Sequence, residues 1–199
     1  CALMNTSQLW CWGDKRDGRL GPGDGLPDDD DAWPAGPVRW TESGDPMGGV
    51  IDFCVGATHT CAIVDVDGDL GEDTETYCWG TDAHVGDGMS AGDLWEPTRV
   101  ADDIGFPLDK DFVEIACEGL EHTCARTADG AEVYCWGDNS SAQLGDGTFE
   151  DKEWAIPVLS AEDTPGLPLA VEQLVTVAGA TFGLTAAGEV VIWGGSNLY

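Results

Sequence analysis

The chain has 199 residues, and its 8 lysine and arginine residues against 38 aspartate and glutamate residues give a formal net charge of −30 at pH 7. This charge argues against a nucleic-acid partner, because contact with the phosphate backbone requires basic patches. Hydrophobic residues make up 42% of the chain, which predicts a folded core rather than a disordered polymer. No run approaches the roughly 20 apolar residues of a membrane helix, so no membrane span is expected.

The composition favours short strands joined by tight turns. The chain holds 28 glycines, 10 prolines and 9 tryptophans, and no stretch longer than about two turns shows the 3.6-residue periodicity of an amphipathic helix. Clusters of glycine and proline punctuate a chain at its turns. We therefore expect an all-β fold.

The dipeptide Trp-Gly recurs along the chain at intervals of 67, 57 and 57 residues, which indicates a structural repeat. Its copies are Trp12-Gly13, Trp79-Gly80, Trp136-Gly137 and Trp193-Gly194. A stretch rich in β-branched and aromatic residues precedes each copy and is expected to form a strand. These stretches are Leu9–Cys11, Thr76–Cys78, Val133–Cys135 and Val190–Ile192. The resulting division is 1–13 as the end of one unit, 14–80, 81–137 and 138–194 as successive repeats, and 195–199 as the start of another.

Each repeat contains further strand signals on either side of Trp-Gly. A strand is expected to begin at a proline in each of three segments, Pro37–Arg39, Pro97–Val100 and Pro157–Leu159. Ahead of Trp-Gly, Phe53–Ile63 aligns with Ala116–Arg126, with Cys, Gly, His, Thr, Cys and Ala at identical spacing. The last copy, Val177–Leu184, keeps this outline without the Cys and His residues.

The eight cysteines are an even number and include no C-x-x-C pair, which favours disulfides over a zinc ribbon. In the third repeat, Asp129-Gly130 is a two-residue hairpin signal. The register of such a hairpin places Cys124 directly opposite Cys135. Disulfides imply an oxidising compartment, so we expect the protein to be extracellular, at the cell surface or periplasmic.

The segment His122–Gly147 carries the most specific motifs, with H-T-C-A, Y-C-W-G, D-N and Q-L-G-D-G in that order. These motifs resemble the regulator-of-chromosome-condensation repeat family, especially its disulfide-bearing bacterial type. The resemblance implies a β-propeller built from four-stranded antiparallel blades. Because such propellers usually close with about seven blades, the chain is expected to be a partial propeller of three to four blades, an excerpt of a seven-bladed ring. Open sheet edges are then expected at Cys1 and Tyr199.

The repeat positions suggest how the cysteines pair. By analogy with Cys124 and Cys135, two further hairpin bridges are expected, Cys1 with Cys11 and Cys61 with Cys78. The remaining residues, Cys54 and Cys117, occupy equivalent positions in successive repeats. Equivalent positions near a propeller axis approach one another, so these two either form a bridge between blades or remain as buried free thiols.

Two metal sites are candidates. Cys54-x4-His59-x-Cys61 and its counterpart from Cys117 to Cys124 offer thiolates and an imidazole to zinc, although disulfides and histidines that hold turns together are the simpler interpretation. The acidic stretch between Cys61 and Cys78 offers carboxylates around a glycine, an arrangement suited to calcium. Its candidate ligands are Asp65, Asp67, Asp69 and Glu72, and the alternative is a solvated hairpin tip. The run Asp28–Asp31 is interpreted as a solvated surface.

Other residues are candidates for contact with a partner or a glycan. Trp33, Trp95 and Trp154 lie in connecting segments and could anchor a protein partner. Asn5 and Asn139 match the N-glycosylation pattern.

The sequence shows no catalytic constellation, since G-x-S-x-G, P-loop and H-E-x-x-H patterns are absent, so we expect no enzyme activity. The main hypothesis is a secreted or cell-surface propeller that works as a protein-binding or assembly module. Its partner would be another protein, the remainder of its own chain, or further copies in a homo-oligomer or larger assembly. The alternatives are a secreted enzyme inhibitor, a ligand- or carbohydrate-binding module and, less favoured, a hydrolase. No cofactor is expected apart from the candidate calcium.

Overall fold

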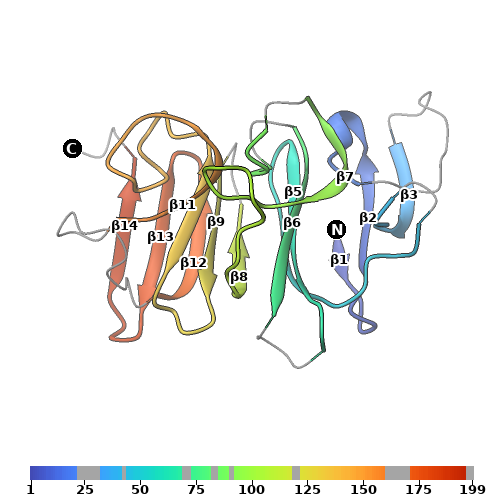
Figure 1. Cartoon of the computed structure of the whole chain (residues 1–199), viewed down its shortest axis with the longest axis horizontal. Helices are drawn as coiled ribbons and strands as arrows, with labels where there is room; N and C mark the ends of the chain where they lie inside the picture. Colours follow the sequence, from blue (N-terminus) through green and yellow to red (C-terminus); the bar gives the residue numbers. More distant parts are fainter. Residues whose placement is uncertain are drawn as a thin grey trace.

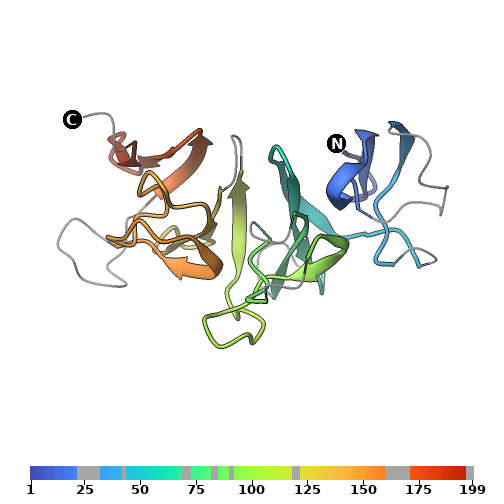
Figure 2. The same ribbon diagram turned by 90° about the horizontal axis from the view of Figure 1, so that it is seen from above.

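The computed structural model describes residues 1–21, 32–41, 44–68, 73–81, 85–89, 92–117, 122–159 and 171–195. The fold is all-β, as expected: these residues form four antiparallel sheets, one short 3-10 turn (η1, Arg16–Gly18) and no α-helix (Figure 1). Seen from above, the sheets follow one another along a curved row (Figure 2). Within the described part of the chain, no helix is long and apolar enough to cross a membrane.

The four sheets follow the order of the chain. The first contains β1 (Ala2–Leu3), β2 (Leu9–Asp14) and β3 (Ala32–Pro37). The second contains β4 (Val50–Val55), β5 (His59–Asp65), β6 (Thr74–Gly80) and β7 (Leu94–Arg99). The third contains β8 (Phe112–Ala116), β9 (His122–Thr127), β10 (Val133–Gly137) and β11 (Lys152–Pro157). The fourth contains β12 (Val171–Val177), β13 (Ala180–Thr185) and β14 (Val190–Gly194).

The expectation of four strands in every blade is met in the second and third sheets only. The first and fourth sheets have three strands each among the described residues. Cys1 aligns with Cys61 and Cys124, so β1 corresponds to the second strand of a blade, and β12 to β14 correspond to the first three. The sheets are also out of phase with the sequence period. Residues 81–137 supply β7 to the second sheet and β8 to β10 to the third, so strands from two periods complete one sheet.

The register expected at the third hairpin is confirmed, since Cys124 pairs with Cys135 and Val133 with Arg126. The turn itself is wider than a two-residue loop. The backbone N–H of Thr127 donates to Glu132, and only Gly130 in the turn takes a positive φ, of 65°. A type I′ turn requires a positive φ at both central residues. Asp129 does not have a positive φ, so the turn is not of type I′.

The positions of the prolines differ from the expectation. Pro37 and Pro157 end β3 and β11, and Pro97 lies inside β7, so no strand begins at these prolines. The strands that contain these prolines, β3, β7 and β11, are each the outermost strand described on one side of their sheet. A residue without an N–H is tolerated on an edge strand because one side of that strand has no partner in the sheet.

The core lies between the sheets. Trp79 and Trp136 are completely buried, and each packs against a glycine turn of the preceding sheet. Gly21 and Gly86 in those turns have φ of 74° and 75°. A Cβ built on Gly86 would lie 2.7 Å from Cδ1 of Trp136, so the close approach requires glycine. The repeated Trp-Gly dipeptide is therefore part of a repeated contact between neighbouring blades.

Candidate functional site

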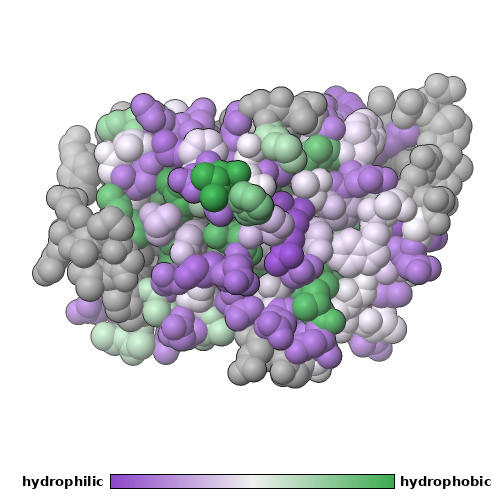
Figure 3. All heavy atoms as spheres, viewed as in Figure 1, coloured by the Kyte–Doolittle hydropathy of each residue, from purple (hydrophilic) through white to green (hydrophobic). Residues whose placement is uncertain are grey.

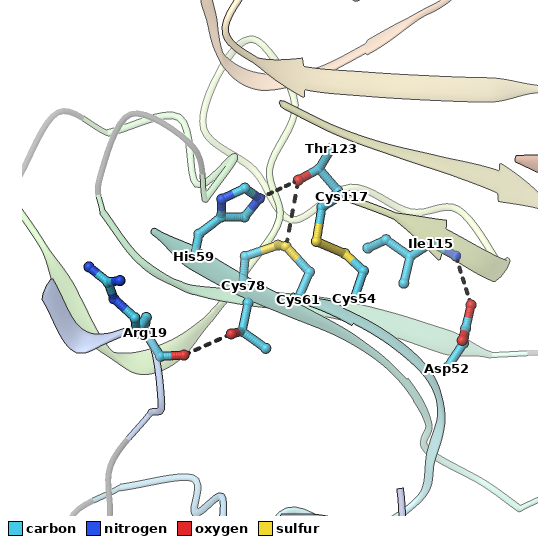
Figure 4. The surroundings of a disulfide bond; sticks show 10 residues. Arg19, Asp52, Cys54, His59, Cys61, Cys78, Ile115, Cys117 and Thr123 are labelled. Carbon is cyan, nitrogen blue, oxygen red and sulfur yellow. Dashed lines mark hydrogen bonds between the residues drawn. A yellow bond between two sulfur atoms is a disulfide. The ribbon is translucent and has the colours of Figure 1, made fainter. Parts of the chain in front are cut away.

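The junction between the second and third sheets contains a covalent link. Cys54, at the end of β4, is joined to Cys117, which follows β8, with their Cα atoms 5.5 Å apart (Figure 4). Both strands lie on the same side of their sheets, and both cysteines are buried. The other three bridges close the hairpins, in the pairs suggested by repeat position, and no cysteine is free. The zinc interpretation is wrong because the sulfur atoms are consumed in disulfides.

Two buried histidines connect successive sheets through threonine hydroxyls. His59 Nε2 lies 2.7 Å from Thr123 Oγ1, and His122 Nε2 lies 2.9 Å from Thr181 Oγ1. The Thr181 hydroxyl donates to the Gln143 carbonyl at 3.0 Å, so it accepts from His122. Donor accounting therefore assigns the proton of neutral His122 to Nε2.

Burial also determines the charge of His122. Removal from water lowers its pKa to about 4, because the charged imidazolium loses its hydration, while the negative charge of Asp138 acts in the opposite direction. The side chain is 1% exposed. His122 is consequently neutral at physiological pH, and its contact with Thr181 is a hydrogen bond between neutral groups.

Carboxylates on the strands at one edge of the sheets form a second repeated contact between blades. Asp52 Oδ2 accepts from the Ile115 N–H at 2.9 Å, and Glu114 Oε1 accepts from the Leu174 N–H at 3.1 Å. Burial is the largest influence on Asp52 and raises the pKa of its carboxyl group. Each carboxylate satisfies a backbone donor of the next sheet, which fixes the relative position of neighbouring blades.

The same edge of the sheets borders a hollow of about 440 Å³. It is lined by residues of β4, β8 and β12, with the Cys54 end of the bridge between blades at its wall. Its lining residues are Cys1, Phe53, Cys54, Val55, Ile115, Ala116, Leu174, Val175 and Thr176. The exposed lining of the hollow is about as polar as it is apolar, so only its concave shape makes it a candidate binding site for a small molecule.

Only part of the candidate calcium site lies among the residues that the structure describes. Asp69 and Glu72 lie outside the described residues. Asp65 Oδ1 accepts from the Gly68 N–H at 2.7 Å, a local turn contact. Among the residues that the structure describes, no group of three His, Cys, Asp or Glu side chains is arranged to hold a metal ion. The calcium site therefore remains a prediction, and Asp28–Asp31 also lies outside the described ranges.

The structure separates the two glycosylation candidates. Asn5 is exposed in the turn between β1 and β2. Asn139 is completely buried, and its Nδ2 donates to oxygens of three residues, Asp146, Thr148 and Glu150. Asn139 therefore holds the loop after β10 together and is inaccessible to a glycan.

Of the candidate aromatic anchors, Trp95 is 49% exposed on β7 and Trp154 is partly buried, while the Trp33 side chain lies outside the described part. Several further exposed apolar side chains were not singled out from the sequence, among them Met89, Ile104 and Phe106. The signal available for two of them was the segment D-D-I-G-F at 102–106, in which apolar residues occur in an Asp-Gly turn.

Comparisons with known proteins agree with this architecture. The family model for the regulator of chromosome condensation (RCC1) repeat matches residues 112–143. The ultraviolet-B receptor UVR8 of Arabidopsis thaliana is 28% identical over 145 residues, which cover 73% of this chain and 29% of the receptor. The E3 ubiquitin-protein ligase HERC2 of Homo sapiens is 28% identical over 197 residues, 97% of this chain and 4% of the ligase. The chain thus spans less than a third of either relative.

Solved structures give the same result for the fold. Human WBSCR16 superimposes with a TM-score of 0.73 at 19% identity, covering 96% of this chain and 44% of that chain. Yeast RCC1 (Prp20), in its complex with Kap60, gives a TM-score of 0.69 at 22% identity over 97% of this chain and 40% of that one. The four sheets are blades of a β-propeller. Residues 112–143, which supply β8 to β10 of the third blade, match the RCC1 repeat, and the chain is similar to proteins of the RCC1-repeat type. The narrower assignment to a bacterial type stays a prediction.

Proposed function

We propose that the chain is a non-catalytic propeller module, secreted or displayed at the cell surface, that binds a protein partner or takes part in an assembly. The observation that carries this proposal is the junction between the second and third blades. A disulfide, a buried His–Thr hydrogen bond and a carboxylate–backbone bond act across it. Blades held in this way present their loops at fixed positions, as a binding scaffold requires. Yeast RCC1 (Prp20) is itself known in complex with a protein, Kap60.

The four disulfides support the proposed oxidising compartment. RCC1-type repeats do not determine that compartment on their own, since the Arabidopsis relative RUG3 is named as mitochondrial.

The first and last sheets expose apolar side chains whose repeat equivalents are buried. Trp12 is 49% exposed, whereas its repeat equivalents Trp79 and Trp136 are completely buried against a preceding blade. The fourth sheet covers the face of the third sheet that carries Cys124 and Cys135. The corresponding face of the fourth sheet carries Ile192, which is 54% exposed. These exposed apolar side chains on the first and last sheets are candidate contact surfaces for a protein partner.

The experiment uses the purified, oxidised chain as bait in the extracellular protein fraction of the source organism. We expect a specific protein to be retained and then to bind again as a purified binary complex. A matched sample with reduced and alkylated cysteines serves as the control, because the proposed binding surface depends on blades that disulfides hold in place. Absence of any partner that survives the binary test, together with turnover of a substrate in a hydrolase screen run with and without calcium, would overturn the proposal.

The hollow at the strand edge supports a second candidate, the binding of a small ligand such as a carbohydrate. A glycan array and a thermal-shift screen separate the two functions. Binding that is lost when Val175→Trp fills the hollow would favour the ligand-binding module. A partner enzyme recovered by the bait and inhibited by the chain would identify the chain as an inhibitor.

A further inference from the structure

An apolar patch lies on the loops at the junction of the second and third blades. It consists of Met89, Ile104 and Phe106, which are 57%, 72% and 64% exposed, and is called the loop patch below. Figure 3 shows an apolar area over the segment between β7 and β8, bordered by hydrophilic residues. Large apolar side chains that gather on an exposed surface mark interaction sites more often than scattered ones do.

Backbone contacts hold the two loops of the patch together. The Ala101 N–H donates to the Gly86 carbonyl at 2.8 Å, so the segment before β8 is hydrogen-bonded to the loop after β6. A Cβ built on Gly88 would lie 3.5 Å from the Cα of Gly105, in ordinary van der Waals contact. Gly88 precedes Met89, and Gly105 separates Ile104 from Phe106. The loop that carries Met89 and the loop that carries Ile104 and Phe106 therefore lie side by side, although these residues are 15 or more positions apart in sequence.

Side-chain hydrogen bonds fix the shape of both loops. Asp102 Oδ1 accepts from the backbone N–H groups of Ile104 and Phe106 at 3.0 and 2.9 Å. Asp87 Oδ1 accepts from the Met89 N–H at 3.0 Å in the same manner. Such Asx turns satisfy the loop backbone internally, so the apolar side chains project from an ordered frame. A preordered surface loses less conformational entropy on binding.

The charge around the loop patch selects the class of partner. The segment 100–111 contains four aspartates and one lysine, Lys110, and that lysine is paired with Glu132 at 2.6 Å. Within the described ranges, Arg16, Arg19, Arg99, Lys110, Arg126 and Lys152 form ion pairs with carboxylates. The excess of 30 negative charges therefore dominates the electrostatics of the chain and favours a cationic partner.

We propose that the loop patch binds a basic protein segment whose apolar side chains contact Met89, Ile104 and Phe106 while its lysines or arginines are attracted by the net negative charge of the chain. This inference rests on the proposed protein-binding function and names the surface and the class of partner. A second copy of the chain is a poor occupant, because two molecules that each carry a charge of −30 repel one another.

The test is an NMR titration of the oxidised chain, with methyl groups of methionine and isoleucine labelled. The probe is a synthetic peptide in which lysines flank a Leu-Phe-Leu centre. One control peptide replaces the apolar centre with serines, and another replaces the lysines with glutamates. We expect saturable shifts at Met89 and Ile104 with the first peptide only, and weaker binding at higher salt.

Matched variants decide whether the loop patch is responsible. Phe106→Ser is expected to weaken binding of the basic apolar peptide about tenfold, as loss of an aromatic anchor does. Phe149→Ser is the control, because Phe149 is equally exposed, at 64%, on the loop between β10 and β11. Equal effects of both variants, shifts confined to Met4, equal binding of the serine peptide, or no binding by the probe would overturn the inference. A partner found by the bait experiment would still sustain the proposed function in each of those cases.

Discussion

At the scale of single residues, the His–Thr contacts show how a repeat position acquires a structural role. His122 is buried and neutral, donates from Nε2 to Thr181, and so connects the third blade to the fourth. An imidazole that stays neutral because of burial makes stability depend on pH.

The first prediction concerns that dependence. An unfolded histidine takes up a proton below about 6.5, whereas His122 in the fold does so only at about 4. Between these values the unfolded state binds more protons, so the His122 contribution is fully present above about pH 6.5 and is lost as pH falls toward 4. The loss amounts to about 3 kcal/mol at most, by the conversion of pKa shifts to free energy.

Urea unfolding of the wild type and of His122→Asn at several pH values measures this effect. The difference between the two proteins removes the contributions of the carboxylates, which titrate in both. We expect the free energy of unfolding of the variant to fall less steeply between pH 6.5 and 4. Parallel curves for the two proteins would show that the burial of His122 does not couple folding to protonation.

At the scale of elements, the contact between a tryptophan and the glycine turn of the preceding blade repeats along the row. Gly21 packs against Trp79, and Gly86 packs against Trp136. A Cβ built on Gly145 would lie 2.8 Å from Cδ1 of Trp193. Glycine is required at these positions for two reasons. It tolerates the positive φ, and its lack of a Cβ leaves space for the tryptophan.

The second prediction separates these two requirements. Gly68→Ala changes a residue with φ of 86° and no atom within 4 Å of the new Cβ, so only the backbone cost of about 1 to 2 kcal/mol is expected. Gly86→Ala adds the overlap with Trp136 and is expected to cost about 1 to 3 kcal/mol more. Thermal and urea unfolding measure both variants. Equal losses of stability would mean that the turn moves away from Trp136 without cost.

At the scale of the whole molecule, the bridge from Cys54 to Cys117 differs from the hairpin bridges. It joins residues 63 apart in sequence and in different blades, whereas Cys124 and Cys135 are 11 apart within one blade. A crosslink that closes a longer loop removes more entropy from the unfolded chain. In a row of repeats, such a link also couples units that otherwise interact only through their shared contact surface.

The third prediction compares two double variants. Removing the bridge between blades with Cys54→Ala and Cys117→Ala is expected to cost about 4 kcal/mol, against about 3 kcal/mol for Cys124→Ala with Cys135→Ala. Only the first pair is expected to uncouple the two halves, so that hydrogen exchange in β1–β7 and in β8–β14 responds at different urea concentrations. A single concerted loss of protection in that variant would show that packing alone couples the blades.

Much of the local architecture could be predicted from the sequence. The Trp-Gly period located β2, β6, β10 and β14, and the alignment of the two H-T-C-A segments located β5 and β9. The hairpin register placed Cys124 opposite Cys135. These features depend on residues close together in the chain, whose pairing follows from alternation and turn position. The starts of β3, β7 and β11 were misplaced, because proline indicates an edge strand without indicating where along that strand it lies.

The sequence by itself therefore determined the all-β class, the repeat and the register within blades. Only the tertiary structure decided which residues meet between blades. It brought Cys54 to Cys117, buried Asn139 while leaving Asn5 exposed, and placed Met89 beside the Ile104–Phe106 turn. The physical reason is that contacts within a hairpin follow from the two-residue period of a strand. Contacts between sheets depend on how twisted sheets pack face to face, which no local pattern of residues encodes.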